Sequence, residues 1–239
     1  MPLKYTTDLG ILERWKNDLA LLARRKIFDI FARELAPAPD ARVADFGVSG
    51  HDEHPVHYFF EDMYPYTENL SAIGREAEEA GWMSARFPGL TFIEADLRSI
   101  PVPDGYFDAG ICNAVVEHAG SRSDQQALVR EVCRVCRNVL FTTPNKRFPL
   151  ELHTFLPIVH WLPDPAFRRS LRWLGMDYFA ELDNLNPLDA HEFLSLFPTN
   201  RENRLAPKGP LGSGILSPNL LCISSASDNK QGTSVEPAV

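Results

Sequence analysis

The chain has 239 residues, of which 44% are hydrophobic and 23% are charged, and its formal net charge is −8 at pH 7. These values are ordinary for a globular protein and exclude a collagen-like, membrane-embedded or largely disordered chain. The length suits one α/β domain with embellishments. The negative charge argues against a nucleic-acid partner, because a phosphate backbone requires a clustered basic face.

Targeting and membrane signals are missing from the sequence. The N-terminus has no basic stretch followed by an apolar core, and no run approaches the roughly 18 apolar residues of a transmembrane helix. We therefore expect a cytoplasmic protein without a transmembrane segment. Among the four cysteines, Cys133 and Cys136 form the one close pair, and no second pair stands at matching spacing. Buried packing is the favoured interpretation of these cysteines, and no metal site is predicted.

The first predicted element is an N-terminal helical segment, residues 1–40. Apolar residues between positions 9 and 35 recur at spacings of three and four, which indicates one or two amphipathic helices, and Pro37 and Pro39 end the pattern. From residue 41 to 225 we expect one domain in which short apolar runs alternate with helical stretches. Such alternation predicts a doubly wound, mostly parallel α/β sheet. Strands are expected near 42–46, 70–74, 90–94, 107–112 and 138–143, and helices near 54–64, 75–86 and 121–137.

Two later segments interrupt this alternation. Residues 144–186 carry aromatic side chains and prolines far in excess of what a simple connection needs, which predicts a cap insertion after the fifth strand. A helix is then expected over 187–197 and a last strand over 218–225, added to the edge of the sheet. Residues 226–239 have too little apolar content to offset the entropy of ordering them, so a disordered tail is expected there.

The ends of the first two strands carry the strongest local signals. Asp45 leads into a tight turn in which Gly47, Ser49 and Gly50 are small enough for a ligand to approach the backbone, although an ordinary turn is the alternative. The turn lacks the G-x-G-x-x-G fingerprint, so a dinucleotide is disfavoured. Glu76 follows the second strand, where a carboxylate can accept the hydroxyl protons of a ribose. A helix-terminal glutamate stabilised by the helix dipole is the alternative there.

The next strand ends carry further polar residues. Asp96 ends the third strand, where its carboxylate could accept the exocyclic amine of an adenine while the following backbone amide, that of Leu97, donates to a ring nitrogen. The fourth strand ends at Asn113 and is followed by the pair Glu117 and His118. One carboxylate would then bind the ribose and another the adenine base.

Taken together, these residues resemble the class I S-adenosylmethionine (SAM)-dependent methyltransferases, particularly the branch that includes quinone-biosynthesis enzymes. The resemblance rests on Asp45-x-Gly47, Glu76, Ala95-Asp96-Leu97 and the continuous stretch from Leu97 through Glu117-His118. It implies SAM as the cofactor and a seven-stranded, Rossmann-like methyltransferase sheet. In such a fold the turn from Asp45 to Gly50 would pass under the methionine part of SAM, Glu76 would hold the ribose, Asp96 and Leu97 would hold the adenine, and Asn113 would line the pocket beside the sulfonium.

The predicted reaction is an in-line displacement that moves the methyl group of SAM to a small-molecule, glycan-linked or lipid-linked acceptor. A base is needed only if the acceptor must lose a proton, and His118 and His153 are the candidates. His118 belongs to the family-like pair with Glu117, and His153 follows the carboxyl end of the fifth strand, where the acceptor should lie. Purely structural roles are the alternative for both histidines.

The nature of the acceptor and a second function stay open at this level. Arg168 and Arg172 share a face of a predicted helix and could serve an anionic acceptor, although a solvated basic face is the alternative. Ser49 and His51 stand where family members usually have glycine. The alternative function is therefore a non-catalytic, methyltransferase-like partner module with weak or no SAM binding. A nicotinamide-dependent oxidoreductase would need the missing glycine fingerprint.

Overall fold

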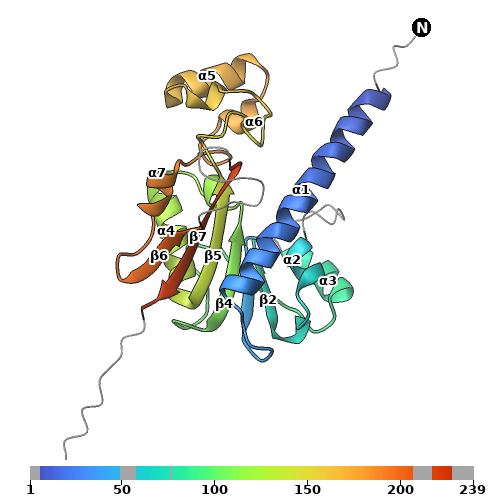
Figure 1. The fold of residues 1–239 in the computed structure, drawn as a ribbon, viewed down its shortest axis with the longest axis vertical. Coiled ribbons are helices and arrows are strands. Elements are labelled where there is room, and N and C mark those ends of the chain that lie inside the picture. Colours follow the sequence, from blue (N-terminus) through green and yellow to red (C-terminus); the bar gives the residue numbers. More distant parts are fainter. Residues whose placement is uncertain (1–5, 49–57, 76, 207–216, 228–239) are drawn as a thin grey trace, which may run out of the picture.

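The computed structural model describes residues 6–48, 58–75, 77–206 and 217–227, with the side chains of 6–18 and 77–79 excepted. The chain begins with a long helix, α1 (Thr6–Glu34), and then alternates strands and helices around one sheet (Figure 1). The helical pattern of the N-terminal segment is thus confirmed as a single helix that ends before Pro37, since proline cannot continue the backbone hydrogen bonding. The expected tail and parts of the turn after the first strand lie outside the described residues.

The sheet has seven strands in the order β3-β2-β1-β4-β5-β7-β6. The pairs among β1 to β5 are parallel, and β7 is antiparallel to both β5 and β6. The predicted doubly wound, mostly parallel architecture is therefore confirmed. The strands are β1 (Val43–Phe46), β2 (Leu70–Gly74), β3 (Thr91–Glu94), β4 (Phe107–Asn113), β5 (Cys136–Pro144), β6 (Arg201–Leu205) and β7 (Asn219–Ala226).

Helices cover both faces of this sheet. One face packs against α1, α2 (Phe59–Met63) and α3 (Ala77–Arg86), and the other against α4 (Arg122–Val135) and α7 (Ala190–Leu194). Alternation along each strand divides the core accordingly: in β5, Leu140 joins the first cluster, whereas Val139 and Phe141 join the second. None of the helices in the described part of the chain combines the length and apolar character that a membrane span requires.

The placement of the last strand is a correction to the sequence-based expectation. β7 does not lie at the sheet edge but between β5 and β6, and β6 is the edge strand. The sequence of β6, Arg-Glu-Asn-Arg-Leu, has no apolar run, and none of its side chains is fully buried. Charged side chains on an edge strand oppose unwanted pairing with other strands. The helix expected over 187–197 is shorter, since Asp189 caps α7 by accepting from the backbone amides of His191 and Glu192.

The cap insertion, residues 144–186, contains η3 (Val159–Trp161), α5 (Asp164–Trp173) and α6 (Asp177–Ala180). These elements lie together beyond the end of β5 (Figure 1) and bury a small cluster of their own, which includes Phe167 and Leu171. Arg168 lies inside this cluster, where its guanidinium donates to the backbone carbonyls of Ala180 and Leu185. The four cysteines are buried free thiols, as the packing interpretation requires.

Candidate active site

A cavity of about 470 Å³ opens at the carboxyl ends of the parallel strands. Crossover connections in doubly wound sheets leave a crevice at this edge, and pockets for cofactors and small ligands have volumes of about 300–1,000 Å³. The walls come from the turn after β1, the end of β2, the segment after β3, the corner after β4, and the cap insertion. Representative lining residues are Gly47, Gly74, Leu97, Val115, His118 and Tyr178.

The turn after β1 requires glycine at position 47. Gly47 has a φ of +95°, which L side chains rarely adopt, and its amide donates to the carbonyl oxygen of Ile73 at 2.9 Å. A Cβ placed on Gly47 would lie 2.4 Å from a methyl carbon of Val115. The backbone therefore forms the cavity wall here, as the sequence predicts for a cofactor turn. Ser49, Gly50 and His51 lie outside the described residues.

Asp45, the acid of the same motif, is buried on the side of the sheet that packs against α1 and α2. Burial raises its pKa to about 7, against the opposing effects of the neighbouring Glu61 carboxyl and Arg24 guanidinium. Burial and the adjacent Asp45 raise the pKa of Glu61 well above its ordinary value. The two carboxyls thus form a buried pair that retains protons near neutral pH. Asp45 is not among the described residues that line the cavity.

The segment after β3 places Ala95 and Leu97 in the cavity wall, and Asp96 stands between them in the chain. The Asp96 carboxylate accepts hydrogen bonds from Arg98 at 2.7 and 3.0 Å and from Arg75 at 3.0 Å. These bonds, chiefly those from Arg98, hold the pKa of Asp96 well below its usual range. The carboxylate is therefore an anion with fixed orientation, the form that an adenine amine requires as acceptor. Glu76, the predicted ribose ligand, lies outside the described residues.

The corner after β4 is held in an uncommon conformation. Ala114 has a φ of +55°, and its amide donates to the backbone and hydroxyl oxygens of Thr142 in β5. The Thr142 hydroxyl in turn donates to the side-chain oxygen of Asn113 at 2.7 Å. Backbone strain of this kind is maintained by the surrounding structure and is common at functional sites. It turns Ala114 and Val115 into the cavity, next to the fixed amide of Asn113.

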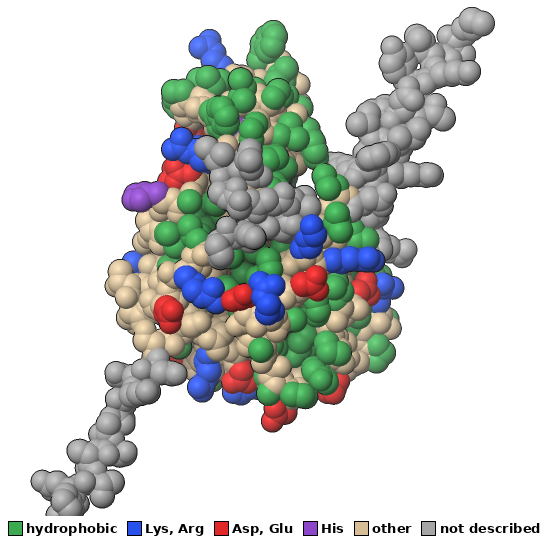
Figure 2. Space-filling view, in the orientation of Figure 1, with side chains coloured by type: hydrophobic (Ala, Val, Ile, Leu, Met, Phe, Trp, Pro, Cys, Tyr) green, Lys and Arg blue, Asp and Glu red, His purple; other side chains and the backbone are tan. Residues whose placement is uncertain are grey.

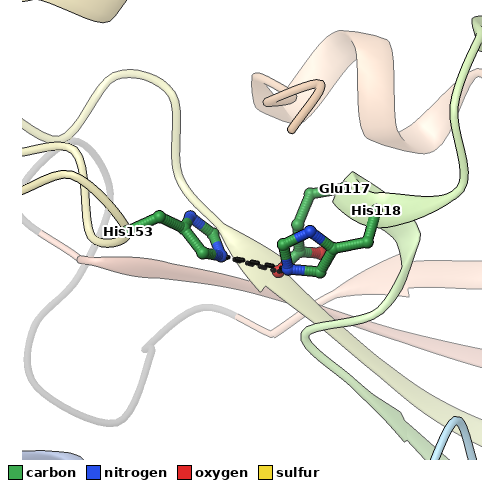
Figure 3. Close-up of side chains that lie close together, drawn as sticks. All are labelled: Glu117, His118 and His153. Carbon is green, nitrogen blue, oxygen red and sulfur yellow. Dashed lines mark hydrogen bonds and ion pairs between the residues drawn. The ribbon is translucent and has the colours of Figure 1, made fainter. Parts of the chain in front are cut away.

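The two histidines predicted as candidate bases, 35 residues apart in the chain, meet at the acceptor side of the cavity. The Nε2 atoms of His118 and His153 are 3.1 Å apart (Figure 3). His118 Nδ1 lies 2.6 Å from the backbone oxygen of Asn184, and His153 Nδ1 lies 2.9 Å from a carboxylate oxygen of Glu151. His118 lines the cavity directly. The structure thus joins two residues that the sequence named separately.

Two glutamates of this cluster were not assigned roles from the sequence. Glu117 is fully buried beside the histidines, and Glu151 is buried behind His153. Burial by itself would raise the pKa of Glu151, but hydrogen bonds and charge from His153 and bonds from Thr154 outweigh it and lower the pKa to about 2. The available signals were the short spacings, Glu117-His118 and Glu151-x-His153, which place an acid next to each histidine.

The arginines of the basic face predicted on α5 lie in different environments in the structure. Arg168 is buried and holds the cap insertion together, so its guanidinium is unavailable to an acceptor. Arg172 pairs with Glu181 at 3.2 Å, and Arg169 is exposed. The insertion offers the cavity chiefly the aromatic ring of Tyr178 and the polar groups of Asp183 and Asn184.

Sequence comparison identifies the class of this fold and cavity. Residues 64–139 match the protein family described as "Methyltransferase domain", and that segment runs from before β2 to the first residues of β5, including Asp96 and the corner at Ala114. The match assigns this segment to a methyltransferase domain. No match to a curated protein was found.

Solved structures with the same fold share little sequence with this chain. The YcgJ protein from Bacillus subtilis superimposes with a TM-score of 0.51 at 16% identity, covering 76% of this chain and 70% of YcgJ. The N-methyltransferase NodS from Bradyrhizobium japonicum, solved with S-adenosyl-L-homocysteine (SAH), gives 0.52 at 11% identity, covering 86% of this chain and 87% of NodS. The PH0226 protein from Pyrococcus horikoshii gives 0.53 at 13% identity, with 84% and 88% covered. At these identities the likeness establishes the fold alone.

Proposed function

We propose that this chain is a methyltransferase that binds SAM in the cavity and transfers the methyl group of SAM to an acceptor that enters beside the cap insertion. The observation that carries the proposal is the glycine turn: Gly47 forms a cavity wall that no side chain could replace, at the strand end where doubly wound sheets bind ligands. The family match over residues 64–139 and the SAH bound by NodS support SAM as the donor.

Within this cavity we assign the adenine to the wall at Leu97, next to Asp96. The Asp96 carboxylate is ionised and oriented by Arg75 and Arg98, and the Leu97 side chain faces the cavity. The methionine end would then lie against Gly47, and the sulfonium would face the corner at Asn113 and Ala114. This orientation directs the methyl group towards His118 and the cap insertion.

The cap insertion favours an acceptor with an apolar part. Several of its large apolar side chains are exposed, including Trp173 at 86% and Tyr178 at 65%. Figure 2 shows hydrophobic side chains gathered over this part of the molecule. Because Arg168 is buried and Arg172 is paired, an aromatic or lipid-linked acceptor fits this surface better than a strongly anionic one. The resemblance to quinone-biosynthesis enzymes points the same way.

Calorimetric titration of the purified protein with SAH tests the cofactor assignment. We expect micromolar binding that Asp96→Ala weakens more than tenfold, since a hydrogen bond to a charged group contributes about 1.5–3 kcal/mol and 1.4 kcal/mol is a factor of ten. Glu94→Ala is the matched control: Glu94 is an exposed acid two residues earlier, and its loss should leave binding unchanged. Absence of SAH binding by the folded wild type would reject SAM-dependent catalysis and favour a non-catalytic partner module.

The acceptor class is tested with methyl-labelled SAM. The protein is incubated with one panel of hydroxylated aromatics that carry alkyl chains and one panel of sugar phosphates. Label transfer to the first panel supports the assignment of the apolar surface. Transfer confined to the sugar phosphates would contradict it, while leaving the SAM assignment intact.

A further inference from the structure

The acceptor side of the cavity carries a cluster that methyl transfer alone does not explain. One oxygen or nitrogen atom from each of Glu117, His118 and His153 lies within 4.8 Å of the others, and the three side chains point towards a common centre (Figure 3). Glu117 and His118 come from η2 (Val116–His118), at the corner after β4, and His153 comes from the cap insertion. The cluster therefore joins the sheet to the insertion at one wall of the cavity.

The hydrogen bonds behind the histidines determine which ring nitrogens face the centre. His118 Nδ1 points at the backbone oxygen of Asn184, and His153 Nδ1 points at the carboxylate of Glu151. Both partners only accept hydrogen bonds, so each Nδ1 carries the proton. In the neutral rings the Nε2 atoms then carry lone pairs, and these lone pairs face each other across 3.1 Å. Such an arrangement is repulsive unless a cation lies between the rings.

Glu117 adds a negative charge aimed at the same centre. Its side chain is completely buried, and its Oε2 atom accepts a hydrogen bond from the Thr143 hydroxyl at 2.9 Å. Its Oε1 atom is buried without a hydrogen-bond partner among the described groups, and lies 3.9 Å from the Nε2 atoms of both histidines. A buried carboxylate oxygen in this state is costly unless it is paired with a cation or coordinates a metal.

We propose that Glu117, His118 and His153 bind a divalent transition-metal ion at the acceptor side of the cavity. Two imidazole nitrogens on one tetrahedral zinc ion lie about 3.3 Å apart, close to the separation observed here. The Glu117 oxygen would move inward by roughly half an ångström to complete the set. Imidazole donors suit Zn²⁺ and its neighbours in the first transition row, whereas Ca²⁺ and Mg²⁺ prefer oxygen ligands.

The surroundings have the features of a supported metal site. The Nδ1 atom of each histidine donates to a carboxylate or a carbonyl group, as is usual for metal-binding histidines. Such bonds fix the ring orientation and leave Nε2 unprotonated. Three protein ligands leave at least one coordination position open, and His118 lines the cavity on that side. An oxygen of the acceptor could occupy that position. If the chain transfers methyl groups as proposed, the metal would lower the pKa of a bound hydroxyl and so replace a general base.

A shared proton is the competing occupant of the centre. Protonation of one histidine would also separate the two lone pairs and would place a positive charge between Glu117 and Glu151. The two occupants predict different behaviour: a metal ion displaces such a proton when it binds, so a cluster arranged for a metal takes up the ion at micromolar concentration, whereas a cluster that serves only to share a proton does not. Metal uptake that depends on the three side chains therefore decides between them.

The test is a metal titration of the full chain without a histidine tag. Protein stripped with a chelator is titrated with Zn²⁺ by calorimetry and with Co²⁺ by visible absorption, whose intensity reports tetrahedral coordination. We expect micromolar or tighter binding, at least a tenfold loss of affinity in Glu117→Gln, and loss of the Co²⁺ spectrum in His153→Ala. His191→Ala is the control, because His191 is exposed on α7, away from the cluster in sequence.

The variants also separate this site from other histidines and from failure to fold. Circular dichroism and SAH titration accompany each metal titration. Zn²⁺ binding that is unchanged in both His153→Ala and Glu117→Gln, or a folded wild type that takes up neither ion, overturns the metal site. SAH binding without metal binding overturns the metal site alone. Metal binding without SAH binding supports the metal site and overturns the proposed SAM cofactor.

Discussion

Replacement of Gly47 by alanine tests the construction of the cofactor turn. The φ of +95° costs a non-glycine residue about 1–2 kcal/mol. The new Cβ would lie 2.4 Å from a methyl carbon of Val115, and overpacking of this kind costs about 1–3 kcal/mol. Together these effects lower the free energy of unfolding by about 2–5 kcal/mol, a large part of the roughly 5–15 kcal/mol of a typical domain.

Urea unfolding followed by circular dichroism measures this loss, and SAH titration measures its effect on binding. Gly175→Ala is the matched control, because Gly175 also has a positive φ, +73°, but no atom lies within 4 Å of its added Cβ. Its cost is the backbone contribution alone, about 1 kcal/mol. In the double variant Gly47→Ala, Val115→Ala, removal of the valine methyls should recover about 1–3 kcal/mol, which appears as a coupling energy between the two sites.

The reasoning would be refuted by a Gly47→Ala protein within 0.5 kcal/mol of the wild type, a difference of the order of ordinary surface substitutions. It would also be refuted by additive losses in the double variant, since additivity would mean that the alanine methyl group and Val115 do not collide. Unchanged SAH affinity in a destabilised Gly47→Ala protein would separate the turn's structural role from cofactor binding.

Three further predictions concern the frame around the site. Arg168→Ala should lower the free energy of unfolding by about 2–4 kcal/mol in urea titrations, because it leaves buried carbonyl groups unpaired. The control Arg169→Ala, at an exposed neighbouring position, should change it by less than about 0.5 kcal/mol. Equal effects of the two variants would contradict the structural role of Arg168 in the cap insertion. Ser121→Ala removes the capping box of α4 and should cost about 1 kcal/mol, and a melting temperature equal to that of the wild type would show that the cap contributes nothing. The raised pKa of Asp45 means that the folded state binds the extra proton between pH 4 and about 7, so its contribution to stability is complete at the lower pH and is lost as pH rises through 7. Asp45→Asn should therefore reduce the decline of unfolding free energy over that range, and an unchanged slope would exclude the pair with Glu61 as its source.

The local sequence was sufficient where an element is specified by its own residues. Strands β1, β2, β4 and β5 are largely buried runs between turn-forming residues, and the order of appearance of β1 to β5 with intervening helices predicts a parallel sheet. The requirement for glycine at position 47 follows from the same pattern. β6 was not predicted because Arg201–Leu205 has no apolar run. The position of β7 depends on its pairing with residues about 80 positions earlier, which no local sequence pattern indicates.

For the site, the sequence determined which chemical groups are present and on which strand ends they stand, because side chains after parallel strands gather at one edge of the sheet. It named His118 and His153 but could not bring them together, since they stand 35 positions apart and the residues between them include β5 and the start of the cap insertion. Only the tertiary structure decided that their Nε2 atoms meet, that Glu117 is buried beside them, and that Arg168 points into the insertion rather than towards an acceptor. These outcomes depend on the path of the chain through the insertion and on desolvation, and both are properties of the packed molecule.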